Sequence, residues 1–231
     1  MKSSTLFITS VATLILAYVP QSVLAQDVTG DASTRFKANE AIQTPKDPED
    51  DEEIVPIYPP TAGPLSINYA SSVNFGKQEV SGSERTFYAA SDTVIKTQTG
   101  ETRQTPNFVQ VTDLRGTGAG WTLSVRQNGP LTNDNNVTIS GARLSISAIS
   151  VKPQHGEAEM VTEMNEQTLD ENGSKQAILT SPEGSGMGTW NVYLGSENDA
   201  TKAIKLVVPK NQPKEKGNYT TSLTWLLEDV L

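Results

Sequence analysis

Apolar and polar residues alternate in short stretches from residue 60 to the end of the chain, a pattern typical of half-buried β-strands. In the stretch LSINYA, for example, Leu65, Ile67 and Tyr69 share one face. Gly-, Asn- and Pro-rich clusters separate the stretches, as turns would. The other stretches are residues 109–114, 121–125, 137–140, 144–150, 190–194, 203–208 and 219–227. We therefore predict an all-β domain over residues 61–231, an antiparallel β-sandwich or a barrel-like fold.

Two further patterns interrupt this alternation. Residues 156–171 are compatible with a short helix, although no capping residue supports one. The stretches 115–125 and 184–194 each place a Gly-x-Gly-x-Gly loop before a predicted strand that is led by a tryptophan, Trp121 or Trp190. Neither loop has the Lys-Ser/Thr pair or the following helix that phosphate binding requires. We interpret the glycines as residues with positive φ in a turn or bulge before a strand.

The first 25 residues have the pattern of a secretory signal. Lys2 supplies a positive charge, residues 6–19 are mostly apolar, and Val23 and Ala25 suit cleavage after position 25. The apolar run is shorter than the ~20 residues of a membrane-spanning helix, and no later segment reaches that length. We expect an exported protein without a membrane span.

Residues 26–60 differ in composition from the rest of the chain. They contain nine acidic and three basic residues and a Pro-rich stretch, PKDPEDDEEIVPIYPP. Like charges repel and prolines block helix and sheet, so we predict a disordered, extended acidic linker. The alternative is a weak cation site made by the clustered carboxylates.

Composition excludes several classes of function. The chain has no cysteine, one histidine and a net charge of -9. The absence of cysteine excludes disulfides, thiolate metal sites and thiol nucleophiles, and a single histidine disfavours zinc sites and a catalytic triad. The acidic balance argues against nucleic acid as a partner. We expect neither a metal nor another cofactor.

Two motifs carry a resemblance to a known family. The first is Trp121-Thr122-Leu123 behind a Gly-rich turn. The second, near the C-terminus, combines Tyr219 with Leu223-Thr224-Trp225 and Leu227. The pair, in this order and behind a signal peptide, resembles the WxL domain of Gram-positive surface proteins over roughly residues 60 to 231. The residues after Leu227 lack the proline that often follows in the family, which affects only the tail.

The resemblance implies a location and partners. WxL proteins attach non-covalently to peptidoglycan at the cell surface. They are typically encoded with other WxL proteins and with a membrane-anchored WxL-interacting protein. We therefore expect a secreted protein of the cell wall that acts in a multi-protein surface complex.

The motif side chains allow two interpretations. Residues two apart on a strand point to the same side, so Trp121 and Trp225 suit a sandwich core. Alternatively, these rings form a platform on which a sugar stacks. Asp113 and Arg115 are then candidate polar contacts to the sugar, unless they form only a weak surface ion pair.

Three functions remain open. The first is a wall-binding module, and the second is an interaction subunit that binds a partner protein (a WxL-interacting protein or a host ligand) with only indirect wall contact. The third is a glycan hydrolase, which needs two carboxylates about 5 to 9.5 Å apart in a cleft. The sequence offers no such paired motif and no catalytic residue, so we expect a binding protein and not an enzyme.

Overall fold

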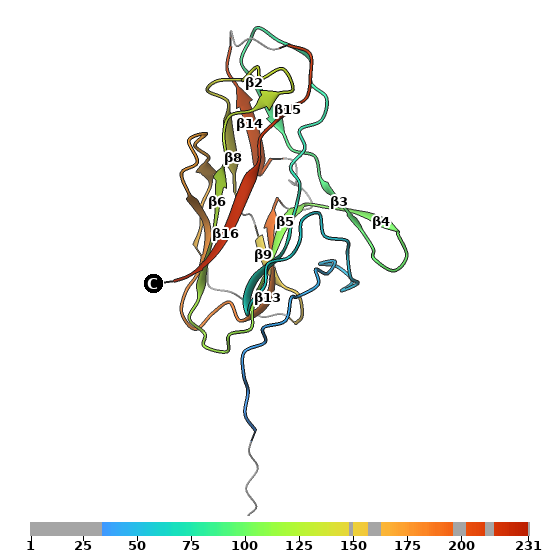
Figure 1. The fold of residues 1–231 in the computed structure, drawn as a ribbon, viewed down its shortest axis with the longest axis vertical. Helices are drawn as coiled ribbons and strands as arrows, with labels where there is room; N and C mark the ends of the chain where they lie inside the picture. Colours follow the sequence, from blue (N-terminus) through green and yellow to red (C-terminus); the bar gives the residue numbers. More distant parts are fainter. Residues whose placement is uncertain (1–33, 148–149, 157–162, 196–201, 211–214, 231) are drawn as a thin grey trace, which may run out of the picture. The chain divides into compact units, whose positions relative to one another are not determined.

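The structure is a computed structural model that describes residues 34–147, 150–156, 163–195, 202–210 and 215–230. From Phe36 onward the chain forms one compact unit. The described residues contain no helix, and their strands pair in antiparallel fashion in several sheets (Figure 1). The predicted all-β class is confirmed. No sheet in the described part of the chain closes into a barrel.

Three four-stranded sheets make up most of this unit. The first has the order β1 (Leu65–Ala70), β5 (Asn107–Asp113), β13 (Gly188–Leu194) and β9 (Ser150–Pro153). The second has the order β10 (Glu163–Met164), β12 (Gln176–Ser181), β6 (Trp121–Gln127) and β16 (Leu223–Asp229). The third has the order β11 (Gln167–Thr168), β8 (Arg143–Ile146), β14 (Ile204–Val208) and β2 (Arg85–Tyr88).

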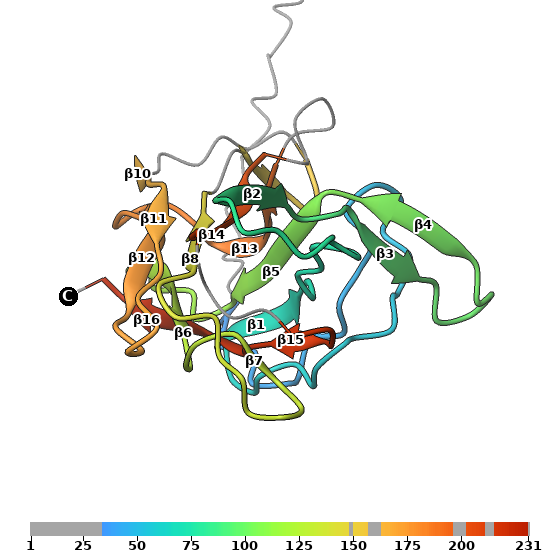
Figure 2. The same cartoon turned by 90° about the horizontal axis from the view of Figure 1, so that it is seen from above.

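Two strand pairs complete the fold. One pairs β15 (Tyr219–Thr220) with β7 (Thr132–Asn133), and the other pairs β3 (Asp92–Ile95) with β4 (Thr102–Thr105). Figure 2 shows the β3–β4 hairpin at one side, with the chain before β1 running beside β3. The short helix with which residues 156–171 are compatible does not form where the structure describes them, because β10 and β11 occupy part of this stretch. Residues 157–162 lie outside the described residues.

One hydrophobic core joins the three large sheets. Alternate residues of their strands meet in it, and its members include Val111 of β5, Leu123 of β6, Ile146 of β8, Val192 of β13 and Ile204 of β14. Each of these residues is fully buried. The period of two in the sequence therefore corresponds to the inward faces of packed sheets.

The acidic segment contacts the β domain, which corrects the prediction of a disordered linker over residues 26–60. Ile54 is completely buried and packs with Tyr69, Val94, Phe108 and Tyr193 in a second cluster. Its neighbours extend the β3–β4 hairpin: Ile54 bridges to Lys96, and the Val55 N–H donates to the Ile95 carbonyl at 2.8 Å. The segment thus covers the face of β5 that is turned away from the main core.

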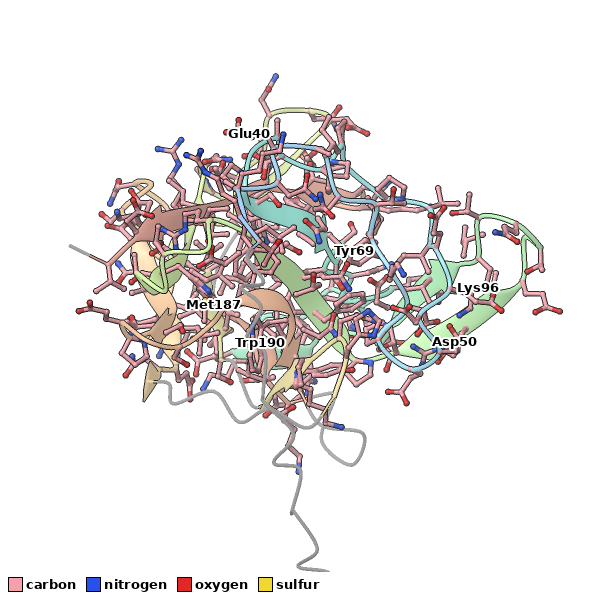
Figure 3. The ribbon with its side chains drawn as sticks, turned by 90° about the horizontal axis from the view of Figure 1, so that it is seen from below. Glu40, Asp50, Tyr69, Lys96, Met187 and Trp190 are labelled. Atoms are coloured by element: carbon pink, nitrogen blue, oxygen red, sulfur yellow. The ribbon has the colours of Figure 1, made fainter. Side chains whose placement is uncertain are left out.

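Ion pairs explain why a run of like charges can pack in this way. Asp47 is completely buried. Its carboxylate forms a salt bridge with Lys96 Nζ at 2.6 Å and a second one with Arg103 on β4. Lys96 also pairs with Asp50, and Figure 3 shows these two side chains next to each other. Composition alone predicted repulsion within the segment, whereas cations of the hairpin neutralise it. We call residues 46–55 the acidic strap.

A buried polar contact fixes the strap to the first sheet. The Gln110 side chain of β5 accepts from the Lys46 N–H at 3.0 Å and donates to the Lys46 carbonyl at 2.9 Å. It also donates to the Asn191 side chain of β13 at 2.8 Å. Because Gln110 and Asn191 are fully buried, they need these partners to offset the cost of leaving water.

Candidate functional site

The two sequence motifs lie on neighbouring strands. β6 carries the first motif and pairs antiparallel with β16, which carries the second (Figure 1). In this register Leu227 lies opposite Leu123, and Trp225 lies opposite Val125. Directly opposed residues share a face of the sheet, so the apolar residues of both motifs point the same way. About one hundred residues of sequence separate two segments that form one local structure.

The apolar motif residues point into the core. Trp121 and Leu123 have no exposed surface. Leu223, Trp225 and Leu227 are partly buried and pack against the same cluster. β16 is an edge strand of its sheet, which explains why its residues are less buried than those of β6. A side chain with the burial of Trp121 cannot stack on a sugar.

Tyr219 does not share this face, contrary to the prediction of one continuous strand over residues 219–227. It lies on β15, pairs with Asn133 of β7, and packs against a third cluster formed around Leu131 and Leu206. Residues 221 and 222 separate β15 from β16. The second motif therefore spans two elements that stabilise different parts of the domain.

The two Gly-rich loops meet at Trp121. The Trp121 Nε1–H donates to the Gly186 carbonyl at 3.0 Å, and the Gly184 N–H donates to the Gly118 carbonyl at 2.7 Å. Every glycine of both loops has positive φ, as predicted. A Cβ atom on Gly186 would lie 2.6 Å from Trp121 Nε1. Glycine is thus required here because the loop backbone touches the indole.

Asp113 and Arg115 form a closed cluster with the protein itself. Arg115 donates to both carboxylate oxygens of Asp113, at 2.9 and 2.7 Å, and to the Gly120 carbonyl at 2.7 Å. It also pairs with Asp229, the last residue of β16. The hydrogen bonds that Arg115 donates to the Asp113 carboxylate raise the pKa of Arg115 above its usual value. The pair is neither exposed nor free to contact a sugar.

The sequence analysis assigned no role to Asp229, because the residues after Leu227 were interpreted as a tail. Its position opposite Trp121 in the β6–β16 register brings it to Arg115. The Arg115 side chain thereby connects the end of β5, the first Gly-rich loop and the C-terminal strand. No local sequence signal identifies this connection.

The remaining motif residues, Thr122 and Thr224, point to the opposite face of the sheet and are partly exposed. Thr122 Oγ1 lies 3.4 Å from Thr180 Oγ1 of β12. Thr224 Oγ1 accepts from the Asn128 side-chain amide at 2.9 Å. These two threonines are the motif residues that a ligand on the outside of the sheet can reach.

We found no arrangement typical of a metal centre or a membrane span in the described part of the chain. No group of three or more His, Cys, Asp or Glu side chains there is arranged to hold a metal ion. These described residues also contain no helix that is long and apolar enough to cross a membrane.

The fold and the paired motif strands define an all-β domain in which β6 and β16 join the two motifs in one sheet. A family model described as "WxL domain surface cell wall-binding" matches residues 24–230, nearly the whole chain. The chain belongs to the WxL family, and it is a surface protein that binds the cell wall. No curated protein and no solved structure matches it significantly.

Proposed function

We propose that this protein attaches non-covalently to the peptidoglycan of a Gram-positive cell wall, after export by a signal peptide over residues 1–25. The observation that carries the proposal is the family match, which extends over both motif strands and the acidic strap. The pairing of β6 with β16 supports it, because it makes both motifs parts of one folded unit. We further propose that the protein acts with other WxL-cluster surface proteins, including a WxL-interacting protein.

A second candidate function is the binding of a partner protein with only indirect wall contact. Exposed apolar side chains next to the β3–β4 hairpin favour it: Val55, Ile57 and Ile95 are each more than two-fifths exposed, and Tyr58 is 63% exposed. The hydrogen bond between Val55 and Ile95 places two of them side by side. Contiguous exposed apolar surface often marks a protein interface.

A pull-down distinguishes these candidates. The mature chain, starting at Gln26, is incubated with labelled peptidoglycan from which teichoic acid has been removed, and in parallel with untreated walls. An acidic all-β protein of similar size serves as the control. Retention on both preparations supports direct binding to peptidoglycan. Retention on untreated walls alone, or on neither, contradicts it, and release of soluble labelled fragments would identify a hydrolase instead of the binding protein that we propose.

A further inference from the structure

The two motif strands, β6 and β16, also have an outer face, which is turned away from the hydrophobic core. Successive side chains of β6 and β16 point to opposite faces of the sheet, so the residues between the inward tryptophans and leucines form a second set on the outer face. The register opposes Thr122 to Glu228, Ser124 to Leu226, and Arg126 to Thr224. Ser124 is buried, so a ligand that approaches these strands from outside the domain meets the other members of this set.

The face continues onto β12, the next strand of the same sheet. Thr180 lies opposite Thr122, and Ala177 lies opposite Ser124. In Figures 1 and 2 strands β12, β6 and β16 lie side by side. Ala177, Arg126 and Glu228 are exposed, so solvent reaches the face on all three strands. We call this set of residues the outer motif face.

Its chemistry is that of hydrogen-bonding groups with little net charge. Near the start of β6 the hydroxyls of Thr122 and Thr180 are 3.4 Å apart, and beyond its end the Asn128 amide donates to the Thr224 hydroxyl at 2.9 Å. Lys175 and Glu228 neutralise each other through a salt bridge of 2.6 Å. Arg126 is exposed and forms no ion pair with another described residue. The face therefore offers donors and acceptors together with one available cation.

We propose that the outer motif face binds the glycan strand of peptidoglycan, an inference that rests on the proposed function. The hydroxyl and acetamido groups of the sugars exchange hydrogen bonds with Thr122, Thr224 and Asn128. Arg126 pairs with a carboxylate of the attached peptide, a contact for which its planar guanidinium is suited. A single cation among neutral hydroxyls fits a glycan that carries occasional carboxylates better than a polyphosphate, which requires clustered positive charge.

The assignment gives the two motifs a common role. Their apolar residues hold β6 against β16 from the inside, and this pairing sets the spacing of the hydroxyls on the outside. The motif tryptophans thus position the binding face without touching the ligand.

Isosteric variants test the proposal. The double variant Thr122→Val and Thr224→Val keeps the shape and strand preference of each residue but removes both hydroxyls. Arg126→Gln removes the cation. The matched controls are Thr86→Val and Arg85→Gln on β2, an exposed strand of another sheet. All variants are made in the mature chain and are first checked for an unchanged melting temperature.

Binding is measured by co-sedimentation with teichoic-acid-free peptidoglycan. We expect the double variant and Arg126→Gln each to bind about tenfold more weakly than the wild type, the effect of losing one or two net hydrogen bonds. The β2 controls should bind as the wild type does. If the wild type binds and the outer-face variants bind equally well, this inference is wrong and the proposed function stands. If the wild type itself does not bind, both are wrong.

Discussion

Gly186 lies where the second Gly-rich loop touches the indole of Trp121. Its φ of 77° is unfavourable for any residue with a Cβ atom, and that atom would collide with Trp121 Nε1 and Ser181. We predict that Gly186→Ala lowers the free energy of unfolding by about 3 kcal/mol, the sum of a left-handed backbone and an overpacked contact. Urea denaturation measures this loss.

Gly184 is the matched control for this prediction. It has a similar φ of 83° in the same loop, but a Cβ atom there would have no neighbour within 4 Å. Gly184→Ala should therefore cost only about 1 kcal/mol, the backbone part alone. Equal losses for the two variants would show that the contact with Trp121 does not matter.

The two motif tryptophans should differ in their contribution to stability. Trp121 is completely buried and donates a hydrogen bond, so Trp121→Ala should cost about 3 to 5 kcal/mol. Trp225 on the edge strand is only partly buried, and Trp225→Ala should cost about 1 to 2 kcal/mol. Thermal or urea denaturation of both variants checks the order. A larger loss at Trp225 would contradict the structure.

Burial of Trp121 and Leu123 could be predicted from the sequence, because alternation on a strand reports which residues share a face. The partner of the indole could not, since Gly186 is 65 positions away in the sequence and belongs to another loop. The same limit applies to Arg115 and Asp229, which are 114 positions apart. Local sequence patterns do not predict contacts between segments that are far apart in the chain.

At the scale of elements, the acidic strap is held by charge. Although burial alone raises the pKa of Asp47, hydrogen bonds from Arg103 and Lys96 lower it from 3.8 to about 2. A carboxylate with a lowered pKa stabilises the folded state above its unfolded pKa, and this contribution is lost as the pH falls. The strap should therefore contribute fully at neutral pH and lose about 2 kcal/mol between about pH 4 and pH 2.

Comparison of the wild type with Asp47→Asn across pH tests this contribution. At pH 7 the variant leaves the buried cations short of a partner and should be destabilised by about 3 kcal/mol. The difference between the two proteins should shrink as the pH falls from 4 to 2. Asp51→Asn is the control, because its partly exposed carboxylate should show a smaller difference. A constant difference down to pH 2 would contradict the assignment.

The strands differ in how well the sequence predicts them. The stretch LSINYA coincides with β1, and Leu65 and Ile67 pack against the main core. The predicted face shared with Tyr69 is wrong, because the register shifts between Ile67 and Tyr69 and places Tyr69 in the second cluster. In contrast, β2 (RTFY) and β4 (TRQT) are only four residues long, and apolar and polar residues do not alternate in either. Residues 137–140 alternate but form only an isolated bridge at Thr138. The strap was predicted to be disordered because its partners Lys96 and Arg103 are supplied by a distant hairpin.

At the scale of the whole molecule, net charge bears on how the protein binds. The chain carries a formal charge of -9. The Gram-positive wall that we propose as its binding partner is itself rich in anionic polymers. Attraction between opposite net charges cannot hold the two together, and one exposed arginine on the outer motif face does not change this balance. Binding should thus depend on hydrogen bonds and shape.

We predict that wall binding by the mature chain is constant or slightly stronger between low and moderate salt, as added ions screen the repulsion. Co-sedimentation with untreated walls over a salt series measures this dependence. A basic protein of similar size provides the comparison and should be released as salt rises. A steep loss of binding by the mature chain would reveal a dominant ionic contact.

The central claim is that the motif tryptophans act through the fold and not as a sugar platform. The most direct test is co-sedimentation of Trp225→Ala with teichoic-acid-free peptidoglycan, at a temperature where circular dichroism shows the variant to be fully folded. We predict that the folded variant binds as tightly as the wild type. A variant that is folded and no longer binds would show that Trp225 contacts the glycan and that the tryptophan does not act through the fold alone.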